Sequence, residues 1–474
     1  MNDNISSPLA EEAANYYTEL LRPVFAGRKW LIAGPVAVGL GGLARRFTAL
    51  GADRPFLIAG TEGTGAMPTP EEAELHVLGL GGKDILEEHR NLHNTLHDLP
   101  PALRRAIDAW DPTGSANFIF ASPLAEARGT PPRPPYGARP ASWAALEDKV
   151  KVDAFWDAAG VKRAPSRVVP ARYESLKTAA AALDRGLGTV WAADARDGTN
   201  GGGLGLRWVR RGADGHASFE SLRRIADRVR VMPFLEGIPA SIHGIVCPDT
   251  VAVFRPVEMV VLRPTDGDRL FYAGCATAFD PNPDDRETMR TVAHRTGTML
   301  RETVGYRGPF GIDGILSEDG YLPTEMNTRA GAALGPLVAG LPDLPLAALC
   351  LAITQGEKLD YRPDLLERAV VQSADAHRTC AGWSVTPNTF DESGSLEVVR
   401  DGDEYREGRE DEEPHGSIQY GPSGLGGFLR FTSQRARIQR GSSAAAEVIR
   451  ALRYADQALG TEFGELEAAR NLRP

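Results

Sequence analysis

The chain has 474 residues with 53 Lys and Arg, 63 Asp and Glu and a formal net charge of −10, a balance that disfavours a nucleic-acid or acidic-membrane partner. The length predicts about three domains of an ordinary globular protein. No apolar stretch is long enough to predict a membrane span, and the N-terminus carries no positive-then-apolar targeting signal, so we expect a cytoplasmic protein. The four cysteines, at positions 247, 275, 350 and 380, form no CxxC pair and are interpreted as buried thiols of a reducing compartment.

The first zone, residues 1–141, begins with the amphipathic stretch EEAANYYTELLRPVF. It continues as an apolar strand, a glycine-rich turn, a helix and a second strand, which predicts a βαβ unit of a doubly wound α/β domain. The turn contains Gly34, Gly39, Gly41 and Gly42, a spacing that does not fit G-x-G-x-x-G. A nicotinamide or flavin site at this turn is therefore the weaker alternative to close packing of a helix on the sheet.

Two further features lie in the first zone. His89, His93 and His97 are four residues apart on a predicted helix, and because they spread over about 12 Å along its axis, we interpret them as a solvated face rather than a metal site. Residues 127–140, ARGTPPRPPYGARP, are too rich in proline for a regular helix or a central strand. This segment is predicted to be a linker or a loop folded over a site.

The middle zone, residues 142–358, contains most of the candidate chemistry. Lys149 lies near the start of a predicted helix, and a glycine-rich loop with Gly201, Gly202 and Gly203 connects two predicted strands. Such a loop lets backbone N–H groups approach an anion, although a flexible hairpin tip explains it equally well. The segment MPFLEG then forms a hinge between two strands, and Arg255 and Glu258 stand among apolar neighbours, where each fits either a substrate site or a structural ion pair.

The stretch GIDGILSEDGYLPTEMNTRAG predicts a β-hairpin with two carboxylates and an amide on one face. A three-residue loop with Gly320 in the left-handed position would pair Ser317 with Tyr321 and Asp313 with Glu325. Asp313, Glu325 and Asn327 would then share one face, and Ile312, Leu316, Leu322 and Met326 the other. Like charges opposite each other are unfavourable unless a cation lies between them, and oxygen ligands without His or Cys suit Mg²⁺ better than zinc.

The last zone, residues 359–474, contains the acidic run RDGDEYREGREDEEPHG, which is predicted to be a solvated loop, then the glycine-rich YGPSGLGGF and a terminal helix. It predicts a small α+β unit.

The ordered set of Lys149, the glycine-rich hairpin, the hinge MPFLEG and the hairpin ending in D-x(11)-E-x-N-x-R resembles the ATP-grasp superfamily of carboxylate–amine ligases over residues 142–358. The details VWAAD, TNGGG and SIHG are most similar to the pheganomycin-type peptide ligases. The resemblance implies an α/β fold with a Rossmann-like pre-ATP-grasp domain (1–141), a two-lobed ATP-grasp domain (142–358) and a C-terminal domain (359–474) that helps to form the acceptor site.

The resemblance also implies roles for individual residues. Asp313, Glu325 and Asn327 match ligands of two Mg²⁺ ions on ATP, and Arg329 matches the arginine that steadies the acyl phosphate or its carboxylate precursor. Arg255 is a second candidate for stabilising the oxyanion. His243 and Glu258 are substrate-site candidates, with a satisfied buried histidine and a Glu258–Arg255 ion pair as the alternatives. The nucleotide contacts implied are Lys149, the loop Gly201, Gly202 and Gly203, the carbonyl of Pro233 and the N–H of Leu235.

The sequence departs from the family at a second nucleotide-binding lysine, because Ala192 and Ala193 occupy that strand. We expect Arg196 or Arg207 to supply the missing charge; a degenerate nucleotide site is the alternative.

The implied activity is an ATP-dependent ligase that activates a carboxylate, such as an amino acid or modified amino acid, as an acyl phosphate and joins it to the amine of an amino acid or peptide, releasing ADP and phosphate. The likeness also implies a role in secondary metabolite biosynthesis. The alternatives are an ATP-binding sensor without ligase activity and a dinucleotide-dependent oxidoreductase. The sequence is compatible with a homodimer.

Overall fold

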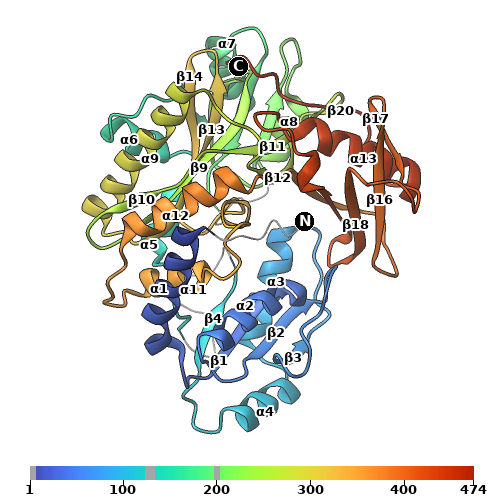
Figure 1. Ribbon diagram of the computed structural model, residues 1–474. Helices are drawn as coiled ribbons and strands as arrows, with labels where there is room; N and C mark the ends of the chain where they lie inside the picture. Colours follow the sequence, from blue (N-terminus) through green and yellow to red (C-terminus); the bar gives the residue numbers. More distant parts are fainter. Residues whose placement is uncertain (1–6, 123–133, 197–202, 474) are drawn as a thin grey trace.

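The computed structural model describes residues 7–122, 134–196 and 203–473, and these residues form four β-sheets. In Figure 1 the N-terminal sheet lies at the bottom in blue, the two sheets of the middle zone lie above it, and the C-terminal sheet lies to the right in red. This is the mixed α/β organisation expected from the sequence.

The N-terminal sheet is parallel, with the order β3-β2-β1-β4. Its strands are β1 (Trp30–Val36), β2 (Phe56–Thr61), β3 (Glu74–Val77) and β4 (Asn117–Phe120), and its helices are α2 (Ala37–Ala49), α3 (Ile85–His97) and α4 (Pro101–Trp110). The prediction of a βαβ unit is confirmed, but the prediction of a glycine-rich turn is wrong. Gly34 lies within β1, and Gly39, Gly41 and Gly42 lie within α2, which follows β1 directly and packs Gly41 against Pro68.

The histidines of α3 do not form one solvated face, which corrects that prediction. His89 is buried, its Nδ1 lies 2.7 Å from Ser122 Oγ, and burial lowers its pKa to about 4, whereas His97 is exposed. Helix periodicity alone therefore misjudged which side of α3 faces the core.

A second, smaller sheet forms the first lobe of the middle zone, with the antiparallel order β5-β8-β6-β7. Its strands are β5 (Arg167–Pro170), β6 (Thr189–Ala193), β7 (Leu206–Val209) and β8 (Arg228–Pro233), with helices α7 (Tyr173–Leu183) and α8 (His216–Leu222). Before it come α5 (Ala141–Ala144), a 3₁₀ turn (Ala145–Glu147) and α6 (Val152–Ala158). Lys149 therefore lies between two short helices and not in the single helix that we expected.

The second lobe is a larger sheet with the order β12-β11-β9-β13-β14. In addition, β10 pairs with β9, and the C-terminal β20 pairs with β11. Its strands are β9 (Ile238–Val246), β10 (Val251–Val253), β11 (Val257–Pro264), β12 (Phe271–Ala276), β13 (Gly308–Ser317), β14 (Gly320–Asn327) and β20 (Leu466–Glu467). Helix α9 (Pro283–Val304) covers one face and shares an apolar core with Ile242, Phe310 and Ile312. The opposite face is left for the site.

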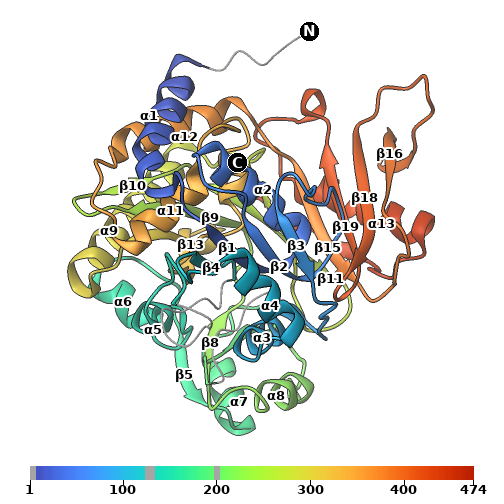
Figure 2. The same cartoon turned by 90° about the horizontal axis from the view of Figure 1, so that it is seen from below.

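Three helices follow the second lobe: α10 (Leu334–Leu337), α11 (Leu346–Gln355) and α12 (Pro363–Ala376). The N-terminal helix α1 (Pro8–Phe25) packs against α11 and α12, and both views place these helices side by side (Figures 1 and 2). One apolar cluster joins α1, the N-terminal sheet, α11 and α12. Helix α12 therefore packs with the centre of the molecule, although it lies beyond residue 358.

The C-terminal sheet is antiparallel with the order β15-β19-β18-β16-β17, and α13 (Ala445–Leu459) packs against it. Its strands are β15 (Ala381–Thr386), β16 (Gly394–Asp401), β17 (Glu404–Glu407), β18 (Gly416–Ser423) and β19 (Gly426–Ser433), followed by a 3₁₀ turn (Arg435–Arg437). The acidic run was predicted to be a loop, but its first part forms the β16–β17 hairpin, in which Arg400 pairs with Tyr405.

All four cysteines are free and buried, as the sequence predicted. Among the helices of the described residues, none combines the length and the apolar character that crossing a membrane would require.

Candidate active site

A cavity of about 930 Å³ lies between the two lobes and reaches the carboxyl end of β4 in the N-terminal domain. Most of the predicted site residues line it: Lys149, Gly203, Pro233, Leu235, His243, Asp313, Glu325, Asn327 and Arg329. Gly201 and Gly202 lie outside the described residues.

The β13–β14 hairpin brings Asp313 opposite Glu325 and Gly311 opposite Asn327. The route differs from the one expected, because the loop has two residues, Ser317 pairs with Gly320, and the extra residue is a bulge at Thr324. Beyond the bulge, the pairing of Asp313 with Glu325 is the one predicted. Between the bulge and the loop, the residues of β14 face the side opposite to the one predicted. Tyr321 instead of Leu322 joins the core against α9, and Leu322 pairs with Ile315, which lines the cavity.

The side chains of the hairpin form an oxygen-rich cluster. Asn327 Nδ2 donates to Asp313 Oδ2 at 2.9 Å, and Lys149 Nζ donates to Glu325 Oε1 at 2.8 Å. Burial, followed by the charge of Glu325, raises the pKa of Asp313 to about 6. Asn327 Oδ1 is buried and has no hydrogen-bond partner among the described residues. Two carboxylates and an orphaned amide oxygen fit a hard cation such as Mg²⁺.

The cluster contains two carboxylates and one amide, and within the described residues no group of three or more His, Cys, Asp or Glu is arranged to hold a metal ion. A metal with nitrogen or sulfur ligands, such as structural zinc, does not fit this set. Magnesium that is shared with substrate phosphates needs fewer protein ligands.

Two residues of β9 support Asp313 from the neighbouring strand. Ser241 is paired with Asp313, and its Oγ donates to Asp313 Oδ1 at 2.5 Å. His243 Nε2 lies 2.8 Å from Ser241 Oγ, and the imidazole ring packs against Gly311 and Gly331, where a Cβ atom would collide with it. Burial lowers the pKa of His243 to about 4, so the ring is neutral. His243 lines the cavity, as expected of a substrate candidate, but it also orders the polar chain to Asp313.

Three charged side chains meet beside the hairpin. Glu147 accepts hydrogen bonds from Arg139 and from Arg329, and its Oε1 also accepts the backbone N–H of Thr328 at 3.0 Å. Burial raises the pKa of Glu147, but the nearby Arg329 and Arg139 outweigh it, so that the pKa lies below its ordinary value. Arg139 and Arg329 line the cavity, so two guanidinium groups border this corner.

The nucleotide end of the cavity is lined by both lobes. Pro233 ends β8, and Leu235 follows it in the hinge before β9, so the backbone positions that the resemblance implied border the cavity. Phe234 stacks on Trp208 with ring centroids 4.0 Å apart, which holds the hinge against β7.

The expected substitutes for the missing lysine are elsewhere, which corrects that prediction. Arg196 bonds Asp227 and the carbonyl of Arg224, and Arg207 bonds backbone carbonyls and Ser221; neither lines the cavity. Arg230, which sequence reasoning missed, is the cross-strand partner of Ala192.

Arg230 is fully buried and lines the cavity. Its Nε donates to Asp153 at 2.9 Å and its Nη1 to the carbonyl of Thr324 at 2.7 Å. The alternation of β8 could have indicated that Arg230 faces the same side as Ala192 of β6.

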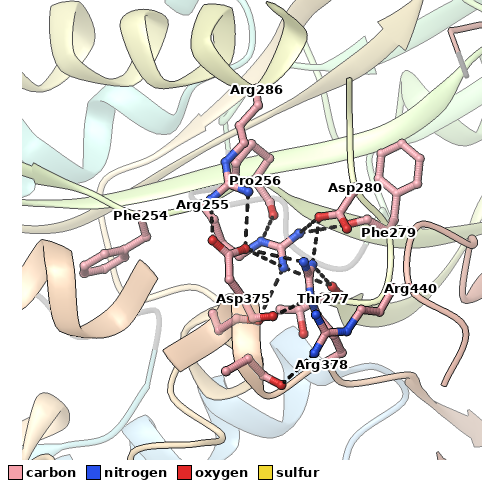
Figure 3. A network of polar contacts seen from close by, with 12 residues as sticks. Phe254, Arg255, Pro256, Thr277, Phe279, Asp280, Arg286, Asp375, Arg378 and Arg440 are labelled. Atoms are coloured by element: carbon pink, nitrogen blue, oxygen red, sulfur yellow. Dashed lines mark hydrogen bonds and ion pairs between the residues drawn. The ribbon is translucent and has the colours of Figure 1, made fainter. Parts of the chain in front are cut away.

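Arg255 and Glu258 are not brought to the cavity, so their predicted roles in catalysis and substrate binding are wrong. Arg255 is fully buried, donates to Asp280 Oδ1 at 2.7 Å and to several carbonyls, and forms an ion pair with Asp375 (Figure 3). Glu258 accepts a hydrogen bond from the N–H of Ala444 at 2.7 Å at the start of α13. Both residues are structural, and they do not pair with each other.

No protein-family model matches the chain, and no curated protein matches it. Among solved structures, an L-amino acid ligase from Bacillus licheniformis matches with a TM-score of 0.50 and 14% identity, over 91% of this chain and 98% of that chain. An ADP complex of N5-carboxyaminoimidazole ribonucleotide synthetase matches with a TM-score of 0.49 and 12% identity, over 91% and 98%. The carboxyaminoimidazole ribonucleotide synthase of Aspergillus clavatus with ATP matches with 0.48 and 12%, over 91% and 99%. The chain has the ATP-grasp fold.

Proposed function

We propose that the protein is an ATP-dependent carboxylate–amine ligase that releases ADP and phosphate. The observation that carries the proposal is the convergence of Asp313, Glu325 and Asn327 with Lys149 and Arg329 in one cavity. Oxygen ligands for a hard cation, an ammonium group and a guanidinium group are the set that phosphoryl transfer to a carboxylate needs.

The nucleotide lies across the hinge in this proposal. The carbonyl of Pro233 accepts from the adenine and the N–H of Leu235 donates to it. Lys149 contacts the phosphates, and Gly203, the described end of the glycine-rich segment, lines the cavity.

Asp313, Glu325 and Asn327 would hold Mg²⁺, and the resemblance implies two ions. Bound there, the metal would neutralise charge on the phosphates of ATP. Ser241 Oγ donates to Asp313 Oδ1, and Lys149 Nζ donates to Glu325 Oε1. The orientation of these oxygens is thereby set by the protein before any ion arrives.

The acid binds beside Arg329, whose guanidinium is held by Glu147. One carboxylate oxygen attacks the γ-phosphorus of ATP, and the bond to the β-bridging oxygen breaks, which gives an acyl phosphate and ADP. The amine nitrogen then attacks the acyl carbon, the C–O bond to phosphate breaks, and the nitrogen loses a proton as the amide forms. Arg329 can donate to the oxyanion of the intermediate. An amino-acid or peptide acceptor is supported by the sequence likeness to pheganomycin-type ligases.

The test is incubation with Mg·ATP, hydroxylamine and a panel of carboxylic acids, with ADP and hydroxamate as the two products measured. Glu325→Ala should abolish both, whereas Glu318→Ala, on the exposed tip of the same hairpin, should leave both unchanged. Acid-dependent ADP with hydroxamate supports the proposal. AMP in place of ADP refutes it, and ATP binding without any acid-dependent turnover favours a nucleotide sensor.

A further inference from the structure

The cavity extends beyond Arg329 into a chamber between the N-terminal domain and helices α10 and α11. Its walls there come from α2, from the carboxyl end of β4, and from the segment that follows β14. The carboxyl ends of parallel strands are a common place for ligands. Because Arg329 and these walls line the same cavity, the chamber is continuous with the corner at Arg329, where the proposed function places the carboxylate of the acid.

The chamber walls are apolar side chains that the fold leaves accessible. Leu43, Ala121, Leu334, Val338 and Leu351 pack against the main apolar core, yet each is only partly buried and each lines the cavity. Apolar surface that stays accessible to water inside a cavity is stabilised when an apolar ligand covers it. This lining therefore favours an apolar ligand body.

The charges around the cavity are one-sided. Among the described residues of its lining, the only carboxylates are Asp313 and Glu325, and both belong to the cation cluster. Arg46, the cation at the chamber, donates to the carbonyls of Pro342 and Leu344 at 2.9 Å each. An ammonium group in the chamber would find no carboxylate among the described residues that line the chamber, so within this part of the chain its desolvation would lack an ion-pair partner.

We propose that the acid activated by this protein has an apolar body and no free ammonium group beside its carboxylate, as in an alkyl acid, an aryl acid or an N-acylated amino acid. The inference rests on the proposed function, in which Arg329 binds the carboxylate. The apolar body lies in the chamber against Leu43, Val338 and Leu351.

The experiment compares acids that share a skeleton. 3-Phenylpropanoate is paired with phenylalanine, which adds an ammonium group, and hexanoate is paired with adipate, which adds a second carboxylate. Binding in the presence of Mg·ADP is measured by saturation-transfer NMR, and turnover is measured as ADP released with Mg·ATP and hydroxylamine. The apolar member of each pair should bind at least about ten-fold more tightly, because a pocket without a partner for a polar group rejects it.

Val338→Thr places a hydroxyl in the chamber at nearly constant volume. It should weaken binding of 3-phenylpropanoate about ten-fold while leaving ATP affinity unchanged. Val77→Thr is the matched control, because Val77 is 37% exposed on the N-terminal sheet and does not line the cavity. This control should bind both ligands as the unchanged protein does.

The outcomes separate the two proposals. Tighter binding of the apolar acids that Val338→Thr weakens supports the chamber assignment, even if no ADP is released and the ligase proposal fails. Equal or tighter binding of phenylalanine or adipate overturns the chamber assignment, even if both are turned over. Binding of 3-phenylpropanoate that Val338→Thr leaves unchanged overturns it as well.

Discussion

Replacing Glu147 by Gln removes the anion that holds two arginines at the carboxylate corner of the cavity. Oε1 of Glu147 accepts from Arg139 Nη1 and from the N–H of Thr328, and Oε2 accepts from Arg329 Nη1. Side-chain exposure is 5% for Glu147, 7% for Arg139 and 22% for Arg329, so water screens the trio little. The change keeps the shape of the side chain and alters only its charge and one oxygen.

The structure gives the size of the effect. A glutamine oxygen can keep the bonds of Oε1, but its NH₂ group then faces Arg329, so that a charge-assisted hydrogen bond of about 1.5–3 kcal/mol is lost. Removing one partner from a buried ion pair costs about 3–5 kcal/mol. We expect Glu147→Gln to lower the free energy of unfolding by about 3 kcal/mol, and to raise the KM for the acid more than that for ATP, because Arg329 loses its anchor.

The pH dependence has a defined sign. Because Arg329 and Arg139 hold the pKa of Glu147 below its ordinary value, the ionised group stabilises the fold above about pH 4.3, the unfolded-state value. This contribution is lost as the pH falls through the folded-state pKa. The difference in the free energy of unfolding between the unchanged protein and Glu147→Gln should therefore be largest at neutral pH and become smaller in acid.

Thermal and urea unfolding at several pH values measure these effects. Glu19→Gln is the control, since Glu19 pairs with Arg22 at the surface with 69% of its side chain exposed, and its loss should cost at most about 1 kcal/mol. If Glu147→Gln unfolds like this control, or if the difference grows in acid, the assigned role of the trio is refuted.

Three further changes test neighbouring assignments. Ser241→Ala removes the hydroxyl that supports Asp313 and should raise the Mg²⁺ concentration for half-maximal ATP binding about ten-fold or more, measured by calorimetry. Arg255→Met should lower the free energy of unfolding by about 3 kcal/mol, seen in urea unfolding, without changing ATP affinity, because Arg255 is structural. Arg230→Ala should weaken ATP binding at least about ten-fold in the same calorimetric assay if this cavity-lining cation takes the place of the missing lysine. Unchanged affinity would mean that Arg230 serves only Asp153.

The hairpin shows how far the sequence carried the site. Asp313 pairs with Glu325 whenever the hairpin contains one extra unpaired residue between them. That residue gives the same pairing whether it lies in the loop, as predicted, or at Thr324, as observed. Pro323 was the missed signal, because a proline in a strand favours an edge position or a bulge, and β14 is an edge strand with its bulge beside Pro323.

Other parts of the site depend on contacts between distant segments. Arg139 lies in the proline-rich segment, which was predicted to be a linker or a loop folded over a site. Its Nη1 donates to the carbonyl of Thr328 across 189 positions of the chain. No local pattern carries that information. The charge partner of Arg329 was missed for the same reason, because Glu147 is separated from it by 182 positions.

Glu258 was assigned to the wrong side of the sheet because the side it faces depends on how β11 is paired with β9. In β11, Val257 pairs with Ser241 and Glu258 with Ala240, and residues paired across antiparallel strands face the same side. Ser241 supports Asp313 on the cavity side, so Glu258 must face the other side, toward α13. A shift of one residue would have placed Glu258 in the cavity and Val257 under the helix. The sequence of β11 is compatible with both registers, and only the pairing with β9, set by the tertiary fold, decides between a substrate residue and a helix cap.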